Sequence, residues 1–409
     1  MKKIIDNIGR RNFIGKITKG LGAGAVLGVG PVQYVLADPE EQNEGSYFTV
    51  MPYLQNPTPA TMDILFVTRD PSFSWVELED GEKAQGKFYA VEDGLIQANQ
   101  RHFCVRLSGM SPGRTYRYKV YSKVIDQFKP YEVKYGDVME SQVYSFTTPD
   151  PGSASVSALV LNDLHQIDGV LKEQVELNGD FDFDFCLLNG DVFDHPESES
   201  QVIEKLLSPI TGLFASEVPF MLARGNHETR GSYARNLKGH FSFPDGKYYY
   251  EFKNGPVQWV VLDTGEDKPD DHPVYAGLTD FDTYREEQAL WLAKIFEQGL
   301  DAGILYRVVV MHIPPFNSGE WHGTLHCRSV FSPVFEKYGV DMVLSGHTHK
   351  HGFYAPCEDH SYTLIIGGGP RKGSRTITQV YANQAGLHAK LIAEGGEVIG
   401  KTTLVPQKK

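Results

Sequence analysis

Side chains that can bind metal ions follow five apolar segments of this sequence, at the point where each segment ends. In the last of them, residues 342–345 lead into Gly346, and His347 and His349 follow with one residue between them. Glycine is depleted in strands, and two histidines are costly to bury unless each has a partner. The pair therefore indicates a functional position at the end of a buried strand.

The other four clusters have the same position relative to their apolar segments. They are Asp163 with His165, Asp191 with Asp194, Asn226 with His227 and Glu228, and His312 alone. Loops beyond the carboxyl ends of strands in an open α/β sheet converge on one crevice. Taken singly, each cluster also fits a helix cap, a turn or a buried histidine with a partner. Five clusters in order after five strands instead favour one shared site.

The residue types select the chemistry of such a site, because aspartate, histidine and asparagine suit divalent metals such as Mn, Fe, Co or Zn. Seven groups are candidate ligands: Asp163, His165, Asp191, Asn226, His312, His347 and His349. A single zinc ion takes four ligands, so seven groups fit two metal ions that share one carboxylate. The glycines at 190, 225 and 346 allow sharp turns and close approach. Gly346 is expected to make the turn that points the two following imidazoles at different ions.

Residues 156–405 are predicted to form a layered α/β domain. Several runs, such as PFMLA at 219–223, are apolar at every position, which is typical of strands buried on both faces. Amphipathic stretches separate the runs, at 169–178, 201–214, 283–298 and 332–338. Strands that alternate with helices make a layered α/β domain.

Residues 46–148 are predicted to form a separate β-sandwich. Short alternating runs rich in β-branched and aromatic residues, such as MDILFVT at 62–68 and SWVELED at 74–80, are separated by Gly, Pro and Asp. Pro112-Gly113 predicts a turn, with Tyr116 three residues after it. This resembles the tyrosine corner of fibronectin type III domains, in which the hydroxyl ties the corner together. A linker rich in proline and small residues follows at 147–155.

The net charge limits the classes of partner. The chain has 409 residues, which suggests two domains, and a formal net charge of −13. So acidic a surface repels nucleic-acid phosphates and anionic lipids. We therefore expect no nucleic acid as a partner, whereas the oligomeric state stays open.

Residues 1–37 resemble an export signal. A basic start that contains Arg10-Arg11 precedes a short, glycine-rich apolar stretch and a Val-x-Ala site before Asp38. The paired arginines favour a twin-arginine signal; an ordinary secretory signal and a retained anchor are the alternatives. The apolar stretch is shorter than the roughly 20 residues of a spanning helix. We expect a protein of the periplasm or cell exterior, without stable membrane insertion once the segment is removed.

The four cysteines, at positions 104, 186, 327 and 357, have no metal-binding spacing. A bridge between Cys327 and Cys357 could form in an oxidising compartment. Cys186 lies in an apolar run and is expected to be a buried thiol.

The combined motifs resemble those of the calcineurin-like metallophosphoesterases. Asp-x-His, Gly-Asp, Gly-Asn-His-Glu, a lone strand-end His and Gly-His-x-His occur in that order between residues 156 and 400. The preceding sandwich resembles the N-terminal domain of purple acid phosphatases, a branch of the same superfamily. The resemblance implies a four-layer α-β-β-α catalytic domain behind a fibronectin type III-like domain.

The resemblance also implies a role for each matching residue. One metal would be bound by Asp163, His165 and His349, the other by Asn226, His312 and His347, and Asp191 would bridge them. His227 would be the general acid or phosphate contact, with Glu228 orienting it or the neighbouring ligands. His322, in the segment IPPFNSGEWHGTLH, would be a further phosphate contact, and His326 is a weaker candidate.

Two departures from the purple acid phosphatase pattern are informative. His165 replaces the glycine of the first motif, and Asp194 replaces the tyrosine three residues after the bridging aspartate. Without a tyrosinate ligand we expect a colourless enzyme with two divalent ions, Mn, Fe or Zn. Asp194 is instead expected to accept a hydrogen bond from a ligating histidine.

The resemblance, together with the export signal, implies an exported phosphomonoesterase whose partner is a small phosphorylated substrate. Two cations about 3.5–4 Å apart lower the pKa of a bridging water, whose hydroxide attacks phosphorus. A phosphodiesterase or nucleotide hydrolase is the alternative, because Asp163-x-His165 is the form common in diesterase branches. A non-catalytic binding protein of the cell surface is the third hypothesis.

Overall fold

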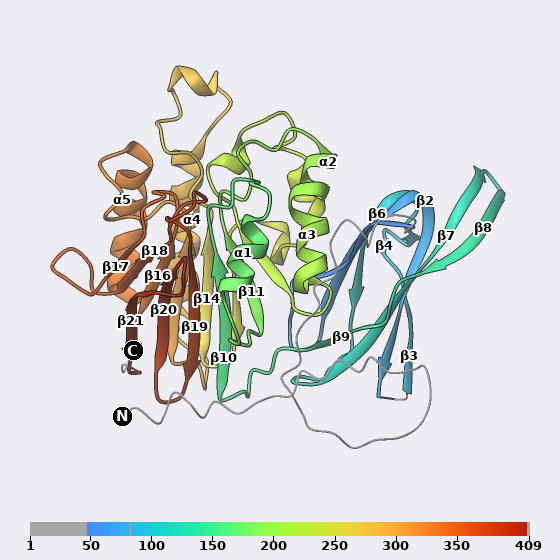
Figure 1. The fold of residues 1–409 in the computed structure, drawn as a ribbon, viewed down its shortest axis with the longest axis horizontal. Coiled ribbons are helices and arrows are strands. Elements are labelled where there is room, and N and C mark those ends of the chain that lie inside the picture. Colours follow the sequence, from blue (N-terminus) through green and yellow to red (C-terminus); the bar gives the residue numbers. More distant parts are fainter. Residues whose placement is uncertain (1–46, 82, 407–409) are drawn as a thin grey trace. The chain divides into compact units, whose positions relative to one another are not determined.

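The computed structural model describes residues 47–81 and 83–406. The expected signal segment, residues 1–37, lies outside the described residues. Within the described part of the chain, no helix is both long and apolar enough to cross a membrane. Two regions follow one another, a strand-rich region and an α/β region (Figure 1).

The strand-rich region is built around one long strand. Its strands are β1 (Phe48–Gln55), β2 (Met62–Asp80), β3 (Lys83–Phe88), β4 (Val91–Glu92), β5 (Leu95–Ile96), β6 (Ala98–Leu107), β7 (Thr115–Lys129), β8 (Glu132–Glu140) and β9 (Tyr144–Thr147). The first part of β2 pairs with β1 and β6, and its second part pairs with β3 and β7. The strands that pair with the first part of β2 form one half of the sheet, and those that pair with its second part form the other half. Because β2 belongs to both halves, hydrogen bonds join seven strands into one sheet rather than two separate ones.

Side chains from both halves of this sheet share one apolar core. Ile64 and Phe66 come from the first part of β2, Val76 and Leu78 from the second, and Phe103 from β6. A core enclosed between two halves of a sheet is the arrangement of a sandwich. The strand-rich character predicted for residues 46–148 is therefore present within the described residues.

The predicted tyrosine corner is present in the structure. Tyr116 is buried at the start of β7, and its hydroxyl accepts a hydrogen bond from the backbone N–H of Ser111, at 2.8 Å. The bond closes the turn that contains Pro112-Gly113. It therefore fixes the direction in which the chain enters β7.

We expect Tyr116→Phe to lower the free energy of unfolding by about 1 kcal/mol, because the Ser111 N–H loses its acceptor. Denaturant titration followed by circular dichroism measures the change. Tyr131→Phe is the matched control, since Tyr131 is fully exposed at the β7–β8 turn. Equal unfolding midpoints for wild type and Tyr116→Phe would show that the corner bond contributes nothing.

The α/β region contains two six-stranded sheets. The first has the order β12-β11-β10-β19-β20-β21 and the second β13-β14-β15-β16-β18-β17. Their strands are β10 (Ser155–Leu161), β11 (Phe185–Asn189), β12 (Phe220–Ala223), β13 (Tyr250–Asn254), β14 (Val257–Leu262), β15 (Tyr306–Met311), β16 (Met342–Ser345), β17 (Gly352–Tyr354), β18 (Thr363–Ile366), β19 (Thr376–Asn383), β20 (Leu387–Ala393) and β21 (Val398–Leu404). β10, β11 and β12 run parallel, as do β14, β15, β16 and β18.

The helices cover the outer faces of the two sheets (Figure 1). The α-helices are α1 (Val170–Leu177), α2 (Glu199–Val202), α3 (Ser208–Ile210), α4 (Phe281–Glu297) and α5 (His322–Tyr338), and π-helical segments at Ile203–Leu207 and Thr211–Ala215 continue α2 and α3. Along β14, Trp259 and Val261 belong to the core shared with the first sheet, whereas Val260 and Leu262 pack with residues of α4 and α5. This alternation places the second sheet between the first sheet and the helices, which is the predicted α-β-β-α order.

The structure changes one local expectation and decides a second point that the sequence left open. The helix expected at 332–338 is present as the last part of α5, but α5 already begins at His322, after the extended residue Trp321. His322 and His326 therefore lie on a helix rather than in a loop. The bridge between Cys327 and Cys357 is absent, because Cys327 is buried within α5 and Cys357 is exposed, and both thiols are free.

Candidate metal centre

Five loops bring the seven predicted ligands together. They leave the carboxyl ends of β10, β11 and β12 in one sheet and of β15 and β16 in the other. Three groups have ligand atoms within 4.8 Å of one another, and one of them is His165, Asp194 and His227. The two groups that consist of predicted ligands alone are Asp163, His165, Asp191 and His349, and Asp191, His312 and His347. Asp191 belongs to both groups.

Asn226 joins the second group through its side-chain oxygen. Its Oδ1 lies 2.9 Å from Nδ1 of His347, and Nε2 of His312 lies 3.0 Å from Oδ2 of Asp191. In the first group, Nε2 of His165 lies 2.8 Å from Nε2 of His349, and the latter lies 3.4 Å from Oδ1 of Asp163. All seven predicted ligands therefore face a common centre.

The hydrogen bonds of the imidazoles leave lone pairs that face this centre. Nδ1 of His312 lies 2.9 Å from the Asn189 carbonyl oxygen, which can only accept, so Nδ1 carries the proton. Nε2 faces Oδ2 of Asp191 at 3.0 Å; it holds a proton when the ring is charged and offers a lone pair in the neutral ring, which is the form that binds a metal. Two lone pairs at such a distance repel unless a cation lies near both. The donor set therefore fits divalent metal ions.

Asp194 fixes the ring of His165 in the same way. Its Oδ1 lies 2.5 Å from Nδ1 of His165, which is the contact expected of it. The carboxylate accepts the Nδ1 proton and so directs the Nε2 lone pair of His165 toward His349.

The electrostatics of the buried groups also favour cations. Burial opposes ionisation of Asp163, but hydrogen bonds from His165 and His349 outweigh it and lower its pKa to about 2. Burial disfavours the charged imidazole of His312, yet the adjacent Asp191 carboxylate raises its pKa to about 10. Ionised carboxylates in a buried site give a negative potential that a metal ion neutralises.

The backbone is left-handed at most of the predicted ligands. Positive φ angles occur at Asp163 (51°), His165 (49°), Asp191 (51°), His347 (74°) and His349 (55°). Such angles are uncommon for residues other than glycine and cluster at functional sites. Hydrogen bonds between loops hold them there: Asp163 N–H donates to Gly190 O at 3.0 Å, and His165 N–H donates to Asp191 O at 2.9 Å.

The glycines beside the ligands leave room for side chains. A Cβ on Gly190, which has a φ of +79°, would lie 2.3 Å from Nδ1 of His312. A Cβ on Gly346 would lie 2.4 Å from Oδ2 of Asp163, although Gly346 itself is not left-handed. The expectation that Gly346 makes the turn was therefore wrong: His347 has the left-handed angle, and Gly346 permits the close approach of Asp163.

Glu228 connects two of the ligand loops. Its carboxylate is fully buried and accepts backbone N–H bonds from Asp191 and Gly225, each at 2.8 Å, and from Phe193 at 3.0 Å. Burial, reinforced by the charge of Asp191, raises its pKa to about 7. Glu228 thus holds the loop after β11 against the loop after β12, consistent with the orienting role expected for it.

We expect Glu228→Gln to weaken metal binding about 10- to 100-fold and to destabilise the fold by about 1–3 kcal/mol. A glutamine amide has one accepting oxygen, so its NH₂ group must face at least one of the backbone N–H groups. Titration of metal-free protein with Mn or Zn and denaturant unfolding measure the two effects. Glu204→Gln, at an exposed position, is the control. Wild-type metal affinity in Glu228→Gln would contradict this role.

His227 lies beside the predicted ligands rather than among them. Its Nδ1 lies 2.8 Å from the Asp194 carbonyl oxygen, so Nδ1 carries a proton, and its Nε2 lies 4.0 Å from Oδ2 of Asp191. Its own backbone N–H donates to Oδ1 of Asp191 at 3.0 Å. Burial lowers the pKa of His227, in spite of the opposing charge of Asp191. The side chain is partly exposed and can therefore contact a bound molecule.

Arg230 contacts His227, and the motif analysis did not predict it. Its Nη1 lies 3.0 Å from Nε2 of His227, while Nε and Nη2 bind the two carboxylate oxygens of buried Glu266 at 2.9 and 2.8 Å. Glu266 follows the apolar run that forms β14, so it is one more polar residue beyond a strand end. A search for polar residues beyond the end of this run, as made for the other five, would have identified Glu266.

His322 is not brought together with the seven predicted ligands. Its Nε2 lies 2.8 Å from both carboxylate oxygens of Asp282 on α4, and its ring stacks on that of His326 with 5.7 Å between centroids. The pair therefore links α5 to α4 in this structure. A phosphate contact from His322 would require the side chain to leave Asp282.

Residues 156–351 match the family model described as calcineurin-like phosphoesterase. This part of the chain is a calcineurin-like phosphoesterase domain. Members of the family use divalent metal ions, in keeping with the clustered aspartates and histidines of this domain. The recognition made from the motifs is thereby confirmed.

Two solved structures resemble the phosphoesterase together with its strand-rich region. The purple acid phosphatase PPD1 from yellow lupin (Lupinus luteus) seeds has a TM-score of 0.62 and 15% identity, over 87% of this chain and 74% of its own. PhoD has a TM-score of 0.61 and 12% identity, over 89% of this chain and 93% of its own. At these identities the likeness shows the fold alone.

Proposed function

We propose that the protein is an exported phosphoesterase that hydrolyses small phosphate monoesters with two divalent metal ions. The observation that carries the proposal is the position of Asp191, whose carboxylate belongs to both groups of candidate ligands. One ion would be bound by Asp163, His165 and His349, and the other by Asn226, His312 and His347. Mn, Fe and Zn all suit these donors.

The ions would supply a water activated at neutral pH and positive charge for the phosphoryl oxygens. The residues of the chain supply orientation and proton transfer. In this structure Nε2 of His227 accepts from Nη1 of Arg230, so to act as general acid the ring would take up a proton at Nε2 and donate it to the leaving oxygen. Arg230 fixes the ring of His227, and its Nη1 can donate to a phosphoryl oxygen, since Glu266 already holds its other nitrogens.

A phosphodiesterase or nucleotide hydrolase is the second candidate function. It is favoured by His165, which stands where the purple acid phosphatase pattern has a glycine. A non-catalytic surface protein with a structural metal site is the third; retention of all seven candidate ligands argues against it.

The deciding experiment compares a chromogenic phosphate monoester with the corresponding diester after loading with Mn, Fe or Zn, each with and without a chelator. We expect chelator-sensitive hydrolysis with preference for the monoester. Preference for the diester would select the second function. No chelator-sensitive hydrolysis of either substrate would favour the binding protein.

We expect the metal-loaded enzyme to be colourless. The position three residues after Asp191 is Asp194, which binds His165, so no tyrosinate is available there to give an iron(III) charge-transfer band. An absorption spectrum across the visible range of the iron-loaded protein checks this expectation. A purple preparation would contradict it.

We further propose that residues 1–37 direct export and that residues 46–148 are a fibronectin type III-like domain. The Tyr116 corner supports the second point. Fusion of residues 1–37 to a reporter tests the first, and the double substitution Arg10→Lys/Arg11→Lys in that fusion separates twin-arginine export from ordinary secretion.

A further inference from the structure

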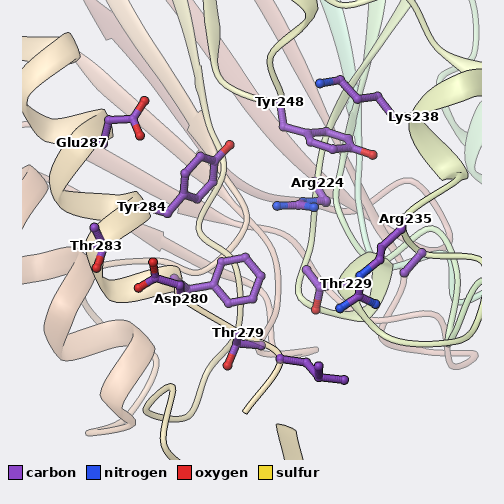
Figure 2. Close-up of a pocket in the computed structure, with 13 residues that line it drawn as sticks. Arg224, Thr229, Arg235, Lys238, Tyr248, Thr279, Asp280, Thr283, Tyr284 and Glu287 are labelled. Carbon is purple, nitrogen blue, oxygen red and sulfur yellow. The ribbon is translucent and has the colours of Figure 1, made fainter. Parts of the chain in front are cut away.

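A cavity of about 480 Å³ lies between two segments of the phosphoesterase domain (Figure 2). One wall comes from residues 224–248, after β12, and the other from residues 278–287, at the start of α4. The volume is in the range of sites for small organic ligands. None of the seven candidate metal ligands lines the cavity, so it is separate from the metal centre.

The first wall carries a local excess of positive charge. Arg224, Arg235 and Lys238 all lie on it, as Figure 2 shows. Arg224 is paired with Asp263 at 2.6 Å. Within the described part of the chain, by contrast, no carboxylate forms an ion pair with Arg235 or Lys238. Two uncompensated cations at one cavity are unexpected in a chain whose net charge is −13.

The carboxylates of the opposite wall do not cancel this charge. Glu287 accepts a hydrogen bond from the Tyr249 hydroxyl at 2.6 Å, and Asp280 is exposed at the start of α4. Both lie across the cavity from Arg235 and Lys238 (Figure 2). An anion that enters the cavity can therefore approach the cations without displacing a carboxylate.

Aromatic rings provide the rest of the lining. Tyr248 lies on the cationic wall, 4.2 Å from the Arg224 guanidinium carbon and 5.5 Å from Lys238 Nζ, measured to its ring centroid. Phe281 and Tyr284 line the opposite wall. Aromatic rings can pack against planar groups, and nearby cations attract an anionic group by charge.

We propose that this cavity binds a planar organic anion, such as an aryl or nucleoside phosphate, at a site distinct from the metal centre. The two free cations contact the anionic group, and the rings contact the planar group. Thr229 lines the cavity and also donates to the Asn226 carbonyl oxygen at 2.8 Å, so an occupant lies against the turn that carries Asn226 and His227.

Isothermal titration calorimetry with phenylphosphonate tests the proposal, because its P–C bond resists hydrolysis by a phosphoesterase. We expect two equivalents to bind the metal-loaded enzyme, one at the metal centre and one in the cavity. Arg235→Ala/Lys238→Ala should bind one equivalent, and Asp191→Ala should also bind one. Combining the three substitutions should remove both. Arg117→Ala/Lys129→Ala, which removes the same charge from the strand-rich region, should leave two.

Binding of one equivalent of phenylphosphonate to the wild-type enzyme would overturn the proposal. This includes the case in which one ligand contacts both the metal centre and the cavity. Unchanged stoichiometry in Arg235→Ala/Lys238→Ala would overturn it too, and this test does not depend on the folding of Asp191→Ala. Two equivalents of inorganic phosphate would show that the rings contribute nothing and would refute the organic ligand. Hydrolysis assays on the same samples separate this proposal from the proposed activity. If the wild-type enzyme binds one equivalent and shows chelator-sensitive turnover, only this proposal is refuted. If it binds two equivalents and shows no turnover, only the proposed activity is refuted.

Discussion

Replacing Asp191 with alanine is expected to abolish hydrolysis and metal binding together. Asp191 is the one carboxylate in both groups of candidate ligands, and its Oδ2 lies 3.0 Å from Nε2 of His312 and 3.7 Å from Nε2 of His165. Its removal takes a ligand from each ion and leaves His312 facing no anion. The loss of metal affinity should exceed the roughly 10- to 100-fold loss that follows removal of a residue that hydrogen-bonds to a ligand.

Metal content by mass spectrometry and hydrolysis of a chromogenic monoester measure the two losses. Asp182→Ala, an exposed carboxylate just before β11, should keep both properties. Asp191 also accepts the His227 N–H, so Asp191→Asn, which keeps an accepting oxygen, separates metal loss from misfolding. Two full equivalents of metal in Asp191→Ala would refute the shared ligand.

His227→Ala is expected to keep both metal ions and to lose about 10²- to 10⁴-fold in turnover. The imidazole is fixed on one side by the Asp194 carbonyl and on the other by Arg230, and it is not one of the seven ligands. Its removal therefore leaves the metal centre intact but takes away the imidazole proposed to transfer the proton.

The size of the loss should depend on the leaving group. A nitrophenolate leaves without much protonation, whereas an alkoxide needs a proton in the transition state, so the kcat of His227→Ala should fall further for an alkyl phosphate. His388→Ala, on β20, is the control. Equal losses for both substrates would assign His227 to phosphate binding rather than to proton transfer. Normal turnover would exclude it from both roles.

The positions of the candidate ligands were predictable because strand ends are visible in the sequence. Asp163, Asp191 and His312 each follow an uninterrupted apolar run, and parallel strands bring such ends to one edge. Pairing across long sequence distances is not visible in that way. The bond between Arg230 and Glu266 joins residues 36 apart and depends on how two loops fold over each other.

Strand continuity was also misjudged around Pro71. The runs at 62–68 and 74–80 suggested two strands, because proline cannot donate to a sheet. The structure has the single strand β2, whose pairing with β6 shifts register between Val67 and Ser72. Pro71 lies in this shift, where no ladder bond is required of it. A local signal for a strand end was thus overridden by the change of partner.

The left-handed backbone at the candidate ligands implies a conflict between the stability of the fold and catalysis. Each such residue other than glycine costs the native state about 1–2 kcal/mol, and five of the candidate ligands have this backbone. A glycine at position 349, for instance, would relieve local strain while deleting an imidazole. Screens that select only for thermal stability should therefore enrich inactive variants with glycine at the ligand positions. Engineering of a more stable enzyme should leave these loops unmutated.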